Sequence, residues 1–209
     1  MSGFRRAGGL LVAVVLVALA ACGAPDHSFV ASPDADLVLK LPRSWTAVRN
    51  DSSSGAGGQP DGGWSAVFDS SHEPDAQHVD LASSVSSPVA YARVTLLDGE
   101  SGGSVSGDKL RDMVLPFTTA GRAQYASDPR AATFKRISDY DVRSPVASGV
   151  HVVYSYDLGH GREVFDQIAM VGSKSNRVYL LVVRCDQACY DAHQREIREV
   201  VDSFTVKVP

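Results

Sequence analysis

The stretch VHVVYSYDL occupies Val150–Leu158, EVFDQIAMV follows at Glu163–Val171, and RVYLLVVR at Arg177–Arg184. The first two alternate apolar and polar residues, which is typical of half-buried strands, and the third has the composition of a more fully buried strand. Glycine-containing segments, Gly159–Arg162 and Gly172–Asn176, separate the three and predict hairpin turns. We therefore predict an antiparallel three-stranded meander.

A closing helix is predicted directly after the meander, over Asp186–Phe204, with Asp186 as its N-cap. Its apolar stripe is expected to contain Cys189, His193, Ile197, Val200, Val201 and Phe204. An earlier helix is predicted over Asp108–Tyr125, capped by Asp108. Pro116 lies inside that pattern and should kink or split the helix.

Shorter strands are predicted upstream of the meander, and Arg130–Ile137 is predicted to be an amphipathic strand or extended segment. The upstream strands are Leu37–Leu41, Trp45–Val48, Trp64–Asp69 and Val89–Leu97. Strands, a helix, more strands and a last helix in this order predict an α+β fold, in which helices cover an antiparallel sheet. A chain of 209 residues with near-average apolar content fits one such domain, which we expect over residues 37–209.

The N-terminus has the pattern of an export signal over residues 1–21. Arg5 and Arg6 precede Leu10–Ala21, an uninterrupted apolar run (LLVAVVLVALAA). A membrane-spanning helix needs about 20 apolar residues, so this run has the length of a signal-peptide core rather than of a span.

The signal ends in Leu19-Ala-Ala-Cys22, which resembles the bacterial lipobox. The resemblance implies lipidation of Cys22, cleavage between Ala21 and Cys22, and anchoring at the extracytoplasmic face of the cell membrane. The alternative is an ordinary secretory signal that a cysteine follows by chance. Residues 22–36 are expected to form a lipidated tether, because Gly23–Asp36 is polar and contains two prolines.

The remaining cysteines, Cys185 and Cys189, form an even pair in a chain predicted to be exported. We expect a structural disulfide at the corner between the last strand and the last helix. A redox-active pair and half of a zinc site are the alternatives, although C-x₃-C matches neither the C-x₂-C redox motif nor a complete zinc ligand set.

The charge balance argues against nucleic acid as a partner. Removing Arg5 and Arg6 with the signal leaves 18 basic residues against 24 acidic ones, a net charge of −6. Binding to nucleic acid requires clustered cations, and no stretch rich in basic residues follows Arg6.

Three stretches are candidates for chemistry or ligand binding. Ser106–Lys109 matches S-x-x-K without the companion motifs of penicillin-binding enzymes, so no catalytic residue is assigned. His72–Asp80 (HEPDAQHVD) could take a metal ion but fits no ligand template, and we predict no cofactor. Trp64 and Phe68 share one strand face and follow the Gly-rich Asp51–Gly63, which suggests an apolar ligand groove with a mobile lid.

Two further motifs carry a family resemblance. The opening Leu41-Pro-x-Ser-Trp-x-x-Val48 resembles that of Mog1/PsbP-like α/β sandwiches, and the ending resembles it too, with the meander, C-x₃-C-Tyr190 and Val201-Asp-Ser-Phe-Thr-Val206. Together they are similar to the LpqN-type lipoproteins of actinobacteria. The resemblance implies a fold and an envelope setting, and it offers no ligand residues to carry over.

From these features we expect a non-catalytic binding or assembly module of the cell envelope, held by its lipid and partnered by an envelope protein. A lipid or small-ligand carrier is the first alternative, and an envelope hydrolase is the second.

Overall fold

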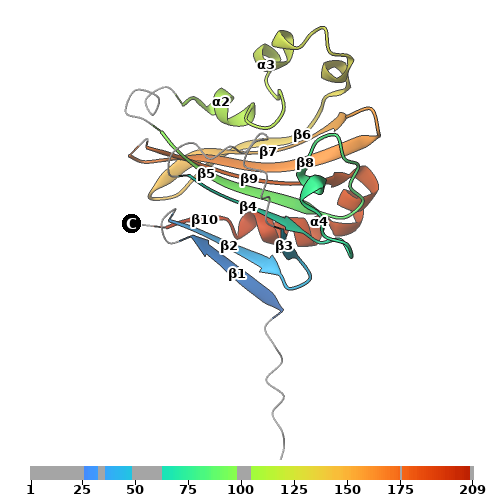
Figure 1. The fold of residues 1–209 in the computed structure, drawn as a ribbon. Helices are drawn as coiled ribbons and strands as arrows, with labels where there is room; N and C mark the ends of the chain where they lie inside the picture. Colours follow the sequence, from blue (N-terminus) through green and yellow to red (C-terminus); the bar gives the residue numbers. More distant parts are fainter. Residues whose placement is uncertain (1–25, 33–35, 49–62, 98–104, 175, 208–209) are drawn as a thin grey trace, which may run out of the picture.

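The computed structural model describes residues 26–32, 36–48, 63–97, 105–174 and 176–207 (Figure 1). The predicted signal peptide, Cys22 and most of Asp51–Gly63 therefore lie outside the described residues. Within the described part of the chain, no helix is long and apolar enough to cross a bilayer.

Seven antiparallel strands form the large sheet, and the predicted meander is its centre. Its order is β3 (Thr46–Val48), β4 (Trp64–Asp69), β5 (Val89–Leu96), β9 (Arg177–Asp186), β8 (Arg162–Gly172), β7 (Ala147–Asp157) and β6 (Lys135–Arg143). A small second sheet has the order β1 (His27–Ser32), β2 (Leu37–Pro42) and β10 (Thr205–Val206).

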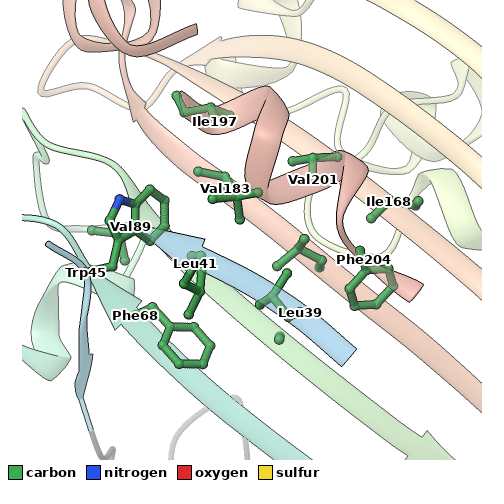
Figure 2. Packing of buried hydrophobic residues seen from close by; sticks show 14 of the residues in the cluster. Leu39, Leu41, Trp45, Phe68, Val89, Ile168, Val183, Ile197, Val201 and Phe204 are labelled. Atoms are coloured by element: carbon green, nitrogen blue, oxygen red, sulfur yellow. The ribbon is translucent and has the colours of Figure 1, made fainter. Parts of the chain in front are cut away.

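The small sheet and α4 (Gln187–Asp202) cover one face of the large sheet (Figure 1). The core between them is aliphatic and aromatic; Figure 2 shows Leu39 and Leu41 of β2 between Phe68 of the large sheet and the helix residues Ile197 and Val201. The antiparallel sheet covered by helices, predicted from the element order, is confirmed.

The opposite face carries α2 (Gly107–Arg111), α3 (Thr119–Gln124) and η3 (Pro129–Thr133) (Figure 1). Aromatic rings fill this layer: Tyr154 stacks on Phe165 with centroids 5.4 Å apart and meets Phe117 edge-on at 5.5 Å. Gln167 of β8 donates from its amide to the Leu110 carbonyl at 2.8 Å. This buried bond fixes α2 on the sheet, since a polar group without a partner there would be costly.

The corner between β9 and α4 has the predicted construction. Asp186 caps α4 by accepting the Cys189 backbone N–H at 2.7 Å, and a disulfide joins Cys185 to Cys189. Both cysteines are buried. The disulfide prediction and the N-cap prediction are confirmed.

Two local predictions need correction. The tether predicted over residues 22–36 contains β1, which pairs with β2 because Val30 adds an apolar residue to the core beside Leu39. The helix predicted over Asp108–Tyr125 is split around Pro116 into two short helices, as that proline predicted, but α2 is capped by Ser106 rather than by Asp108.

Two further corrections concern the second half of the chain. The segment predicted to be extended from Arg130 begins as the 3₁₀ turn η3, and the strand that follows, β6, runs well past Ile137. His193 does not join the buried stripe of α4, because its ring donates to Glu196 at the helix surface.

Candidate binding surface at the β6–β7 edge

Strand β6 is the edge of the large sheet, and among the described residues it pairs only with β7. Ile137 and Tyr140 each remain 49% exposed on it. Charged residues occupy most other positions, and the register shifts between Arg136 and Ser138. Charge and a bulge protect an edge against indiscriminate pairing, so a partner that adds here must match this pattern.

Arg111 of α2 holds β6 from the side of the aromatic layer. Its guanidinium donates to Asp139 at 2.9 Å and to Asp141 at 3.2 Å. Partial burial alone would lower the pKa of Arg111, but the bonds to the two carboxylates raise it above its ordinary value. Arg111 therefore stays charged, and its two ion pairs fasten α2 to β6 side by side.

A groove of about 500 Å³ opens between α2 and the β6–β7 hairpin, next to these ion pairs. Its lining mixes apolar and polar groups: Val105, Leu110, Val142, Pro145 and Val150 on the one hand, Asp141, Arg143, Ser144, Ser148 and Ser173 on the other. The volume lies within the range of small-molecule sites, and the lining suits an amphipathic ligand or side chain.

Gly149, in the floor of the groove, lets β7 and β8 approach closely. A Cβ at this position would lie 1.9 Å from the backbone oxygen of Ala169. We predict that Gly149→Ala lowers the free energy of unfolding by about 1–3 kcal/mol, because the backbone must shift to admit the methyl group. Urea unfolding measures the effect. Gly172→Ala is the matched control, since its nearest neighbour would be a side-chain atom of Tyr179 at 3.6 Å, and an equal loss in both variants would contradict the argument.

A chain of hydrogen bonds supports β6 from the other face of the sheet. His151 of β7 donates from Nε2 to Asp166 of β8 at 2.6 Å, which leaves its Nδ1 to accept from the Tyr140 hydroxyl. Tyr190 of α4 donates to the second oxygen of Asp166 at 3.0 Å. The chain thus joins the exposed edge strand β6 to helix α4 across strands β7 and β8.

The ionisation of the two tyrosines fits a structural role for this chain. Burial raises the pKa of Tyr140, and the negative charges of Asp166 and Asp202 raise it further. Burial and Asp166 also raise the pKa of Tyr190. An activated nucleophile requires the opposite shift, so the arrangement presents Tyr140 as a neutral hydrogen-bonding group.

The groove predicted at Trp64 and Phe68 is not at that position. Phe68 is 2% exposed and belongs to the core (Figure 2). Trp64 packs against the same cluster. Both residues do lie on β4 as predicted, but β2 covers that side of the sheet, which the sequence pattern of β4 does not indicate. The suggested lid, Asp51–Gly63, lies almost entirely outside the described residues.

The His72–Asp80 stretch wraps around a buried carboxylate instead of assembling a metal site. Asp69 accepts from the His78 ring at 2.6 Å and from the backbone N–H groups of Ser71 and Asp75. Among the described residues, no three His, Cys, Asp or Glu side chains are placed to hold an ion. Ser106 of the S-x-x-K match accepts the Lys109 backbone N–H as the cap of α2.

We predict that Asp69 makes the free energy of unfolding depend on pH in the acidic range. Burial alone would raise its pKa, yet the bonds from Ser71, His78 and Asp75 hold the pKa below its ordinary value of 3.8. The stabilisation is present above that value and is lost as the pH falls below it through the lower folded pKa. In Asp69→Asn the unfolding midpoint should therefore fall less with acid than in the parent. Asp75→Asn, which removes an exposed carboxylate from the same loop, should keep the parental slope.

Sequence reasoning missed β6 as a full strand and the His151–Asp166 pair. β6 is exposed on both faces, so its sequence has no alternating apolar residues to reveal a strand. Asp139 and Asp141 interrupt what apolar pattern it has. His151 and Asp166 occupy inward positions of the two predicted strands. A polar residue at an inward position in each of two adjacent strands is the signal that could have indicated this pair.

Comparison with known proteins identifies the fold. No family model matches the chain, and no curated protein matches it. The solution structure of cyanobacterial PsbP from Synechocystis sp. PCC 6803 is similar with a TM-score of 0.50 and 11% identity, covering 91% of this chain and 98% of that one. The Saccharomyces cerevisiae Ran-binding protein Mog1p aligns with a TM-score of 0.45 and 9% identity, over 86% and 95% of the two chains. The similarity to cyanobacterial PsbP confirms the expected PsbP-like fold.

Proposed function

We propose that this chain is an envelope lipoprotein, anchored through Cys22 at the extracytoplasmic face of the cell membrane. In this proposal its PsbP-like domain is a non-catalytic module that binds an extended segment of a partner protein along β6. The lipobox at Leu19–Cys22 supports the anchor. The resemblance to LpqN-type lipoproteins of actinobacteria supports the envelope setting.

The observation that carries the proposal is the construction of the β6 edge. A nine-residue strand offers its backbone groups at the border of the sheet, with Ile137 and Tyr140 exposed beside them. Arg111 and the Tyr140–His151 bond hold it from both faces. Strand addition to a rigid edge draws affinity from main-chain hydrogen bonds and specificity from the flanking side chains.

A site-specific photocrosslinker tests this proposal in living cells of the host. Placed at Ile137, it should give one discrete crosslinked protein, whereas the same probe at Tyr125, an equally exposed residue after α3, should not. With that partner purified, Ile137→Lys should weaken binding about tenfold, which corresponds to about 1.4 kcal/mol. Because Ile137 is exposed, the variant should keep the parental unfolding midpoint. Identical crosslinks at both positions would contradict the proposal.

A ligand carrier is the second candidate, and the groove between α2 and the β6–β7 hairpin favours it. Native mass spectrometry of the chain isolated from its own envelope would then show one additional small mass. Ser148→Trp places a large ring at the exposed mouth of the groove and should remove that mass, whereas Ser127→Trp at an exposed position after α3 should not. A mass retained in Ser148→Trp would exclude this groove as the site.

A further inference from the structure

The outer face of the small sheet carries an exposed aromatic residue. Phe29 of β1 is 70% exposed, the largest exposure among the bulky apolar side chains of the described residues. The register pairs Phe29 with Lys40 and Ala31 with Val38, so these four share one face. The alternate residues, Val30 and Leu39, point into the core.

The same end of the molecule is close to the lipid attachment point along the chain. Five peptide steps separate Cys22 from His27, the first residue of β1. Even fully extended, they span no more than about 18 Å, and Phe29 lies at most about 25 Å of chain from Cys22. A lipidated Cys22 therefore keeps β1 near the membrane whatever path the intervening residues take.

The chemistry of this face suits a lipid–water interface. Phe29 and Val38 supply apolar surface, and Lys40 supplies a cation beside it. Aromatic rings insert at the boundary of headgroups and acyl chains, and basic side chains there reach anionic headgroups. The mature chain has a net charge of −6, so the Lys40 cation on this face favours its approach to such a surface over the rest of the chain.

We propose that the outer face of β1 and β2 rests on the surface of the anchoring bilayer, with Phe29 inserted among the headgroups. The inference rests on the proposed lipidation of Cys22. It also fixes the orientation of the domain, because α2 and α3 lie on the opposite side of the large sheet (Figure 1). The groove beside α2 then opens away from the membrane.

Spin labels on the full lipidated chain test the contact. Ala31→Cys places a label on the proposed face and leaves Phe29 intact, and Ala126→Cys places one at an exposed position after α3. With the native cysteines occupied by lipid or disulfide, the new thiol is labelled alone. In vesicles of phosphatidylcholine and phosphatidylglycerol, the ratio of collisions with oxygen to collisions with a water-soluble nickel chelate should be severalfold higher at residue 31 than at residue 126. Phe29→Ser should reduce that ratio at residue 31.

Intact mass separates the two ways in which the proposal fails. If the protein carries lipid and residue 31 is as accessible to nickel as residue 126, the membrane face is wrong and the anchor stands. If the mass shows no lipid on Cys22, the anchor is wrong and the membrane face is overturned with it. The labelled chains with Cys22→Ala give the baseline in water for both positions.

Discussion

An Arg184→Met variant is expected to lose about 3–5 kcal/mol of its free energy of unfolding, because it leaves the buried Glu163 carboxylate without its guanidinium and with only the His160 ring as a side-chain partner. The Arg184 side chain is 5% exposed and that of Glu163 is 1% exposed. One guanidinium nitrogen of Arg184 donates to Glu163. Burial lowers the pKa of Arg184, and the charge of Glu163 opposes that shift. The stability of a domain is about 5–15 kcal/mol in total, so the loss is a large fraction of it.

The second consequence of this substitution concerns the loop between β4 and β5. The other terminal nitrogen of Arg184 donates to the carbonyls of His78, Asp80 and Ser83 in that loop, and the Asp80 carbonyl also accepts the Ser83 backbone N–H. Without the guanidinium these carbonyls lose their bond to the sheet, and backbone amides of residues 70–88 should exchange with solvent faster than those of β7. Hydrogen exchange at partial denaturant concentration measures this difference.

Two comparisons make the Arg184 prediction specific. Arg184→Met combined with Glu163→Gln should recover part of the loss, since no unpaired charge then remains buried. Arg130→Ala removes an arginine that also bonds a carboxylate, that of Asp128, but at the protein surface. That variant should keep the parental urea midpoint, because solvent screens such a pair. A parental midpoint in Arg184→Met would show that the buried pair contributes nothing.

The centre of the fold could be predicted from sequence because its signals are local. Alternation along β7 and β8, the turns between them and the N-cap at Asp186 each lie within a dozen residues. The edges could not be predicted in the same way. β6 is exposed on both faces, and β1 contributes Val30 alone to the core, so neither has an apolar period that the sequence reveals.

The candidate site depended on tertiary contacts that no spacing encodes. The alternation of Trp64 and Phe68 along β4 fits either an open groove or a buried core face. Strand β2 packs over that face, so Phe68 belongs to the core and Trp64 packs against it. His151 and Asp166 meet because β7 and β8 pair in one particular register. The groove itself forms between α2 and a hairpin more than 30 residues further along the chain. Each of these depends on how elements pack rather than on which elements form.

Removal of the Asp166 carboxylate is expected to act on both stability and the exposed edge. In Asp166→Ala, the Tyr190 hydroxyl and the His151 Nε2–H lose their buried acceptor. A buried donor without a partner costs about 1–3 kcal/mol, so the two together should lower the free energy of unfolding by about 2–5 kcal/mol. Asp166→Asn retains one acceptor oxygen and should lose less. Urea unfolding of the two variants measures this order.

The ionisation of Tyr140 reports whether Asp166 also acts on the edge. Burial and the charge of Asp166 hold the pKa of Tyr140 above its ordinary value of 10.0, so both variants should lower that pKa toward 10.0 while the burial contribution remains. Ring-labelled tyrosine followed by NMR during a pH titration resolves Tyr140, with the exposed Tyr125 as the internal control. If the pKa of Tyr140 is unchanged in Asp166→Asn, the charge of Asp166 does not reach the exposed edge. If it falls, the buried carboxylate acts on the edge through its charge and helps to keep Tyr140 neutral.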